Sequence, residues 1–273
     1  LRALIGLEQI SFLNIVLPIG ISFFTFTQIA FLMDAFQNKV KEKSFLNYIL
    51  FVTFFPHLIA GPIIHHKEMM PQFSDKSIGR MNLPKVALGL IIFSIGLSKK
   101  ILIADSLSIY ADILFNGVQS NLVPELFLSW LGSLAYTFQL YFDFSGYSDM
   151  AIGLALLFGI WLPINFNSPF KAINIIDFWQ RWHMTLTRYI NMYLYTPITL
   201  RFARIGINYS ETTGLLFSLV LPTMIIFLIL GFWHGASWNF ILFGVYWGLI
   251  TCIYIKLKPH TGKLNIPNFF SSI

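Results

Sequence analysis

The sequence is poor in charged residues, and this scarcity sets its class. Only 11% of the 273 residues are charged, whereas soluble domains carry about 25%. Hydrophobic residues make up 56% of the chain, and its mean hydropathy is +0.70. This balance excludes an ordinary soluble globular protein and predicts a membrane-embedded one.

The net charge of +6 comes from basic residues in short segments between apolar runs. Such placement is typical of the flanks of membrane spans. Because there is no separate basic domain, we expect membrane lipid and no nucleic acid as partner. Basic residues follow too many of the runs for the positive-inside rule to give an orientation.

Cysteine is nearly absent. The single Cys252 lies inside an apolar run, which excludes an intrachain disulfide and a Cys-rich metal site. The sequence also lacks a charged n-region with a cleavage site, so it shows no signal peptide. It begins Leu-Arg-Ala, and we expect residues 1–273 to be a single membrane domain truncated at both ends.

Long apolar runs are abundant. A helix that crosses a bilayer needs about 20 apolar residues. The runs predict an all-α, multi-pass protein with six or seven transmembrane helices, and they cover residues 10–33, 45–64, 86–104, 122–142, 147–164, 213–233 and 237–254. The third run is broken by Lys99 and Lys100.

Two stretches do not read as simple spans. Residues 57–73 contain proline and glycine that break a helix, and such backbone is tolerated at membrane depth only where protein or water satisfies it. We expect a re-entrant segment or a cavity wall there. Residues 165–204 have helical character from Asp177 to Leu200 but are too polar for lipid on all sides, so they should lie at the interface or line a cavity.

His234 is the most informative residue. It lies in GFWHGASWNF, within a stretch from Leu219 to Tyr254 that holds no Asp, Glu, Lys or Arg. An ionisable side chain in such a run is costly and functional by default, and imidazole moves protons near neutral pH. Trp233 precedes it, and Trp238 at i+4 is expected on the same helical face, with Asn239 next. The alternative is a histidine that only packs between helices.

A second histidine, His183, lies in DFWQRWHMTLTRYI. On one continuous helix, Trp179, Trp182 and His183 share a face, while Asp177 and Arg181 form an i,i+4 pair. This predicts an imidazole between an aromatic wall and polar groups. An interfacial aromatic belt, with arginine reaching to lipid headgroups, is the competing interpretation.

Two further segments contain titratable groups. In QLYFDFSGYSDMAIG, Ser145 and Gly146 predict a turn, and Asp143 could line a pore or orient a histidine, although Asp149 fits a solvated loop better. In the other segment His65 and His66 are adjacent. We expect them to point to different faces of a helix, and we therefore assign no metal site, even with His57 and Glu68 nearby.

Four motifs together resemble a known family, in its order along the chain. GFWHGASWNFILFG, FWQRWHMTLTRYI, YFDFSGYSDMAIGLALLFGIWLPINFNSPF and FFPHLIAGPIIHHKEMMPQF are similar to the membrane-bound O-acyltransferase superfamily, most of all to its bacterial alginate O-acetyltransferase branch. The resemblance runs from about Phe12 to Tyr254.

The resemblance implies a multi-helix enzyme of the bacterial inner membrane with a funnel through the bilayer. His234 matches the family's intramembrane histidine, and His183 matches a second, upstream position. The acyl donor would be a cytosolic thioester, acetyl-CoA in this branch, with no bound cofactor. The acceptor would be an exported polysaccharide such as alginate, reached through a periplasmic or surface partner of esterase fold.

The residues fit this chemistry. Transfer from a thioester to a hydroxyl needs a base, and a buried neutral imidazole can serve. Asn239, a tryptophan indole N–H or His183 could stabilise the oxyanion. No G-x-S-x-G elbow occurs, so we expect direct transfer without an acyl-enzyme. Two other functions stay open: D-alanyl transfer to teichoic acid, and a proton-coupled transporter, which the lack of a repeat disfavours.

Overall fold

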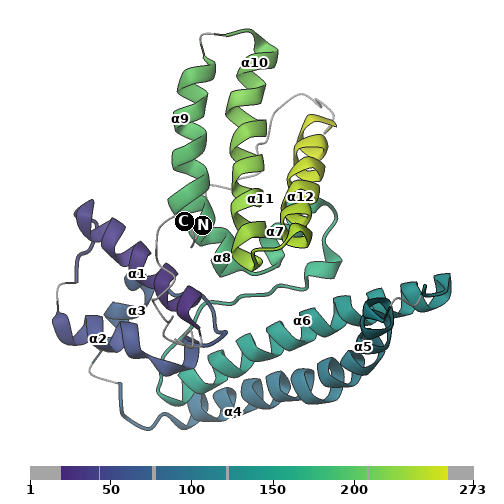
Figure 1. Ribbon diagram of the computed structural model, residues 1–273. Coiled ribbons are helices and arrows are strands. Elements are labelled where there is room, and N and C mark those ends of the chain that lie inside the picture. The colour runs from purple at the N-terminus through teal and green to yellow at the C-terminus, as the bar shows by residue number, and fades with distance from the viewer. Residues whose placement is uncertain (1–19, 43, 76–77, 121–122, 208, 258–273) are drawn as a thin grey trace, which may run out of the picture.

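The computed structural model describes residues 20–42, 44–75, 78–120, 123–207 and 209–257 (Figure 1). Every regular element in these ranges is helical, which confirms the all-α expectation. The α-helices are α1 (Ile21–Phe36), α2 (Phe45–Thr53), α3 (His66–Phe73), α4 (Leu83–Ser98), α5 (Asp105–Gln119), α6 (Leu126–Leu157), α7 (Ile175–Arg181), α8 (Met184–Ile190), α9 (Thr196–Gly206), α10 (Glu211–Leu215), α11 (Leu221–His234) and α12 (Trp238–Leu257). Short 3-10 and π segments adjoin them: η1 (Phe55–His57), η2 (Lys99–Ala104), η3 (Pro169–Lys171), η4 (Asn191–Tyr195) and η5 (Leu216–Val220).

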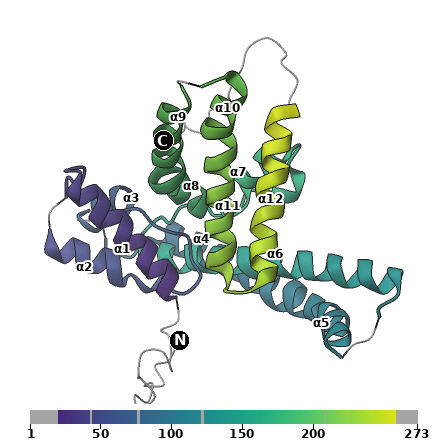
Figure 2. The same cartoon turned by 45° about the horizontal axis from the view of Figure 1, so that its top comes forward.

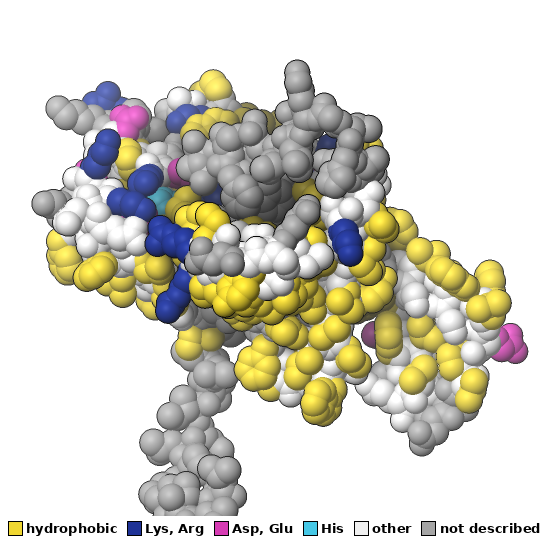
Figure 3. All heavy atoms as spheres, turned by 90° about the horizontal axis from the view of Figure 1, so that it is seen from above, with side chains coloured by type: hydrophobic (Ala, Val, Ile, Leu, Met, Phe, Trp, Pro, Cys, Tyr) yellow, Lys and Arg dark blue, Asp and Glu magenta, His cyan; other side chains and the backbone are white. Residues whose placement is uncertain are grey.

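Three helical stretches of the described chain are long and apolar enough to cross a bilayer. They are Leu83–Gln119, Thr212–His234 and Trp238–Leu257, and the helices Ile21–Phe36 and Phe45–His57 are apolar but shorter. Hydrophobic side chains spread over much of the face seen in Figure 3. So much exposed apolar surface suits contact with lipid. The first ten residues of the predicted run 10–33 lie outside the described ranges.

Helix α6 lies beside α4, η2 and α5 and forms a long arm with them (Figure 1). Glycines allow the backbones to touch: Gly89 faces Gly153, and Gly96 faces Gly146. A Cβ added at Gly146 would lie 2.7 Å from the carbonyl oxygen of Gly96. Membrane helices use small residues at such crossings because lipid supplies no hydrophobic drive for their association.

The predicted turn at Ser145 and Gly146 is wrong. Helix α6 is continuous through both residues, so the two runs expected at 122–142 and 147–164 are largely one helix. The glycine there serves close helix packing rather than a chain reversal.

The acidic side chains of α6 bind lysines of the neighbouring π segment instead of bordering a loop. Asp143 pairs with Lys100 at 2.6 Å, and Asp149 pairs with Lys99 at 2.5 Å. These lysines also do not end the third predicted run, because helical structure continues through η2 into α5. Each charge gains an opposite partner where two helices meet, as charged groups within membrane helices require.

The proline- and glycine-rich stretch 57–73 breaks the helix as predicted. Helix α2 ends at Thr53, and non-helical backbone at 61–65 is buried before α3 begins. The N–H of Ile63 donates to Thr185 Oγ1 at 2.9 Å. A protein side chain therefore satisfies this buried backbone, as the apolar setting demands.

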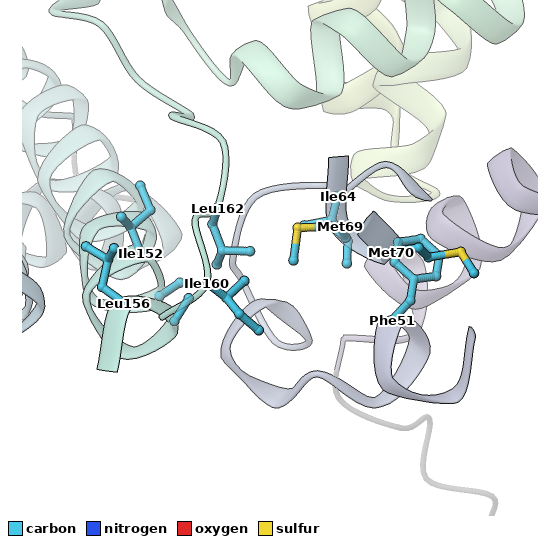
Figure 4. Close-up of a cluster of buried hydrophobic side chains, with 10 residues drawn as sticks. Phe51, Ile64, Met69, Met70, Ile152, Leu156, Ile160 and Leu162 are labelled. Atoms are coloured by element: carbon cyan, nitrogen blue, oxygen red, sulfur yellow. The ribbon is translucent and has the colours of Figure 1, made fainter. Parts of the chain in front are cut away.

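Two apolar clusters hold the helices around this stretch. The first joins α2, α3 and the end of α6 (Figure 4) and includes Phe51, Ile64, Met69, Met70, Ile152, Leu156, Ile160 and Leu162. The second joins α1, α8, η4 and α11 and includes Ala30, Ile63, Leu186, Tyr189, Ile190, Tyr193 and Ile226. Through Ile63 and Ile64 the broken segment contributes to both clusters, which fixes its position between them.

Replacing Gly146 with alanine is expected to destabilise the protein, because the new Cβ would press on backbone that cannot move by itself. Overpacking of this kind costs about 1–3 kcal/mol, although alanine in a helix is otherwise favoured over glycine by about 1 kcal/mol. Thermal unfolding in detergent, followed by tryptophan fluorescence, measures the effect. The control is Gly214→Ala, where the nearest atom lies 3.5 Å away, and it should be neutral or stabilising. Equal melting temperatures for both variants would contradict the close packing.

Candidate active site

His183 lies between two short helices rather than within one. Helix α7 ends at Arg181, and α8 begins at Met184. His183 itself has φ 44° and ψ 54°, a left-handed conformation that is uncommon for a side-chain-bearing residue. The expected shared helical face with Trp179 and Trp182 is therefore wrong. Strained backbone of this kind persists only where its surroundings fix it.

Asn165 supplies much of that fixing. Its side-chain Oδ1 lies 3.0 Å from His183 Nδ1 and accepts hydrogen bonds from the Thr185 hydroxyl at 2.9 Å and the Thr185 N–H at 3.3 Å. Its Nδ2 donates to Ser148 Oγ on α6 at 3.2 Å, and its backbone carbonyl accepts from Met184 N. Asn165 is 1% exposed, so water does not compete with these bonds.

This arrangement also fixes the tautomer of His183. A backbone N–H can only donate, so the Asn165 atom facing Thr185 N must be the oxygen. That oxygen can only accept, and therefore Nδ1 of a neutral His183 must carry the proton. The other ring nitrogen, Nε2, then presents a lone pair. Nε2 is buried and has no hydrogen-bond partner within the described residues.

The surroundings of His183 are aromatic. Phe144 contacts the imidazole edge-on with 4.7 Å between ring centroids, while Phe23 and Phe166 stack at 6.3 and 6.4 Å. The ring is 5% exposed. Burial, followed by the nearby charge of His234, lowers the pKa of His183 to about 3. His183 is therefore neutral at physiological pH, with its free nitrogen available to a donor.

His234 occupies the last position of α11, and its side chain is exposed. The expectation of a buried imidazole is wrong, because the chain turns at Gly235 and starts α12 at Trp238, which leaves His234 at the end of a helix (Figure 2). Trp238 therefore does not share a helical face with it and is 77% exposed. The imidazole instead contacts Trp233, Phe240 and Phe243, at centroid distances of 4.7, 6.0 and 5.8 Å.

The tight turn after His234 depends on close packing of α11 against α12. A Cβ on Gly231 would lie 2.2 Å from the carbonyl oxygen of Phe240, and one on Gly244 would lie 2.4 Å from that of Phe227. The two backbones therefore touch along both helices. This contact holds His234 at the end of a rigid pair instead of on a loose loop.

Helix α1 connects the surroundings of the two histidines. Its Phe23 stacks on His183, and its Phe26 packs at 5.5 Å against Trp233, which contacts His234. The indole Nε1 of Trp233 is buried with no hydrogen-bond partner among the described residues. This region therefore offers a lone-pair acceptor and an N–H donor to a bound molecule.

The other candidate residues have more varied positions. Trp182 packs on Phe166 at 5.2 Å and joins the aromatic wall. Arg181 pairs with Asp177 at 2.7 Å, as predicted, and also donates to the Asn167 carbonyl at 3.3 Å. It thereby secures the loop that carries Asn165. Asn239 is exposed in the first turn of α12, and Asp143 is paired with Lys100.

Sequence reasoning missed Asn165, Ser148 and Thr185. Asn165 marks the start of the polar stretch after an apolar run, but nothing in the spacing connects it to a histidine 18 positions later. The connection is made by the loop reversal between α6 and α7, which no periodicity reports.

The chain is similar to known proteins over nearly its whole length. A model of the membrane-bound O-acyltransferase family matches residues 8–261. The chain is 47% identical to a peptidoglycan O-acetyltransferase of Helicobacter pylori, over 93% of this chain and 50% of that protein. It is 39% identical to the probable alginate O-acetylase AlgI of Azotobacter vinelandii, over 93% of this chain and 47% of that protein.

A more distant similarity links the chain to a teichoic acid D-alanyltransferase of Bacillus subtilis, with 29% identity over 88% of this chain and 59% of that protein. The chain spans about half the length of the peptidoglycan O-acetyltransferase and alginate O-acetylase relatives. The family model covers nearly the whole chain, and a relative that is 47% identical aligns with 93% of it. The protein therefore belongs to the membrane-bound O-acyltransferase family.

Proposed function

We propose that this chain carries the catalytic core of an O-acetyltransferase that modifies an exported polysaccharide at the bacterial inner membrane. The observation that carries the proposal is the pairing of His183, neutral and fixed in one tautomer, with His234 in a family of O-acyltransferases. The relatives named for O-acetyl transfer are more similar, at 47% and 39% identity, than the D-alanyltransferase at 29%. The comparison favours an acetyl group, and we propose acetyl-CoA as its donor.

The two histidines take different roles. The accessible His234 acts as general base and removes the proton of the acceptor hydroxyl. The hydroxyl oxygen then attacks the thioester carbonyl, the C–S bond breaks, and the imidazolium of His234 returns the proton to the leaving thiolate. His183, with its low pKa, is too weak a base for this step. Its Nε2 instead accepts a hydrogen bond from a neighbouring hydroxyl of the acceptor sugar and so holds the attacking hydroxyl in place.

The oxyanion of the tetrahedral state needs a donor. His183 cannot supply one from Nε2, because its proton is on Nδ1. The indole N–H of Trp233 is buried, adjacent to His234 and without another partner in the described chain. We assign it this role in preference to the exposed Asn239. Delivery to the polysaccharide would involve a periplasmic or surface partner of esterase fold.

The activity is tested with membranes that contain the protein, labelled acetyl-CoA, and either alginate or peptidoglycan as acceptor. Label in one of the polysaccharides supports the proposal and identifies the acceptor. A parallel reaction supplies D-alanyl thioester on its carrier protein with teichoic acid. Transfer in that reaction alone would replace acetyl transfer by D-alanyl transfer.

The His234→Ala variant is expected to lose transfer by about 10²–10⁴-fold, the range for removal of a general base. It should insert and accumulate as the wild type does, because the His234 side chain is exposed. Leu242→Ala, a change at a side chain of α12 that is 62% exposed, is the matched control. Wild-type rates from a well-expressed His234→Ala protein would remove His234 from the mechanism.

The Asn165→Leu and His183→Ala variants are expected to lower the rate, roughly tenfold or more, by releasing or removing the oriented imidazole. Asn165→Asp keeps an oxygen that accepts from His183 Nδ1, so it should retain more activity than Asn165→Leu. The readout is initial rate at limiting donor and acceptor, together with thermal stability. If Asn165→Asp and Asn165→Leu differ in thermal stability but not in initial rate, Asn165 has a purely structural role.

The protonation state of His183 can be measured directly by ¹⁵N NMR on protein labelled at histidine, with His183→Gln identifying the signal. Because the folded pKa of about 3 lies below the ordinary value, we expect the neutral Nδ1–H tautomer from about pH 8 down to about pH 5. Because folding favours the neutral form of His183, this group's contribution to the free energy of unfolding decreases as the pH drops below the unfolded pKa of about 6.5. An imidazolium signal near neutral pH would contradict the assignment.

A further inference from the structure

Three buried side chains outside the candidate active site converge on one point. They are Asp34 near the end of α1 and His65 and His66 at the start of α3, with exposed fractions of 2%, 8% and 3%. One nitrogen or oxygen from each lies within 4.8 Å of the others. Asp34 Oδ2 is 2.9 Å from His66 Nε2 and 3.2 Å from His65 Nε2.

Adjacent histidines reach one point because only one of them is helical. His65 has φ −118° and ψ 138°, an extended conformation, and α3 begins at His66. The two imidazoles come within 4.5 Å between centroids at an angle of 32°. The expectation that these rings point to different faces of a helix is therefore wrong. The argument against a metal site, which depended on that expectation, no longer holds.

Tyr193 of η4 provides a fourth polar atom. Its hydroxyl lies 2.8 Å from His65 Nε2 and 3.1 Å from Asp34 Oδ2, and the side chain is 7% exposed. A small cavity of about 10 Å³ is lined by His65 and Tyr193. That is room for roughly one water-sized ligand beside the cluster.

We propose that Asp34, His65 and His66 bind a divalent transition metal, with Zn²⁺ as the best fit and the Tyr193 hydroxyl or a water in the fourth position. Imidazole and carboxylate are ligands that Zn²⁺ takes at about 2.0–2.2 Å in a tetrahedral arrangement. Tetrahedral ligands at that distance are about 3.3 Å apart. The separations of 2.8–3.2 Å between neighbouring ligand atoms in the structure need only a small expansion.

Metal binding would replace an existing set of hydrogen bonds. His65 Nδ1 accepts from Lys67 N at 3.2 Å, so its proton is on Nε2, facing Asp34 and Tyr193. Coordination through Nε2 moves that proton to Nδ1 and gives up one helix cap in exchange for a metal bond. Because a protonated imidazole cannot coordinate a metal, binding weakens as the pH falls.

The site would act as a structural clamp. It connects α1, α3 and η4, which are far apart in the sequence. Arg188 of α8 and Glu68 of α3 form a bidentate ion pair between the same parts of the chain. Because α1 also supplies Phe23 to the surroundings of His183, the metal would fix one wall of the candidate active site without touching the reacting groups.

The test uses the protein purified in detergent with a tag free of histidine. Metal content is measured by mass spectrometry after dialysis, and the chelated protein is titrated with Co²⁺ and then with competing Zn²⁺. We expect about one metal per chain, visible absorption typical of tetrahedral Co²⁺, its loss on Zn²⁺ addition, and a higher melting temperature with Zn²⁺. None of these readouts depends on acyl transfer.

Variants locate the site. Asp34→Asn and His66→Gln should weaken Zn²⁺ binding by at least about tenfold, whereas His57→Gln, at another buried histidine, should bind as the wild type does. Tyr193→Phe separates a tyrosine ligand from a water in the fourth position. Wild-type protein with no retained metal and no tetrahedral Co²⁺ spectrum would make the cluster a hydrogen-bonded network only. Binding that survives both Asp34→Asn and His66→Gln would also overturn the proposal.

Discussion

One buried amide, Asn165, holds the candidate active site together. Its side-chain oxygen accepts from the Thr185 hydroxyl, the Thr185 N–H and His183 Nδ1, and its nitrogen reaches Ser148 on α6. An unpaired polar group in this setting would be costly, so each of these bonds is worth more than its counterpart in water. The left-handed backbone of His183 and its tautomer both follow from this arrangement.

The network extends beyond the histidine. Thr185 Oγ1 donates to Asn165 and accepts from Ile63 N, and so it ties the broken 57–73 segment to the loop that carries Asn165. The buried polar atoms of this network are thus paired within the protein. His183 Nε2 and Trp233 Nε1 are among the buried side-chain atoms of the described chain that have no hydrogen-bond partner, and both lie in the candidate active site. Polar atoms of a substrate are suited to be the hydrogen-bond partners of these two groups.

Helix α1 connects the two polar centres. Its Phe23 and Phe26 reach the neighbourhood of His183 and Trp233, while its Asp34 meets His65 and His66. A change in the packing of α1 therefore reaches both centres. Close glycine contacts in α4–α6 and α11–α12 supply the rigid frame around them, because touching backbones leave little freedom to shift.

The sequence by itself determined the class, the family resemblance and both histidines of the candidate active site. Low charge and long apolar runs report directly on the solvent around a helix, and motif similarity needs no geometry. Tertiary structure decided the rest. The sequence around Gly146 predicts a turn, and only the packing of α4 against it shows that the glycine serves helix contact. Helical periodicity predicts that His65 and His66 point in different directions, but the helix begins only at His66. Asn165 gained its role through a chain reversal that places it against His183, because hydrogen bonds between distant segments leave no period in the sequence.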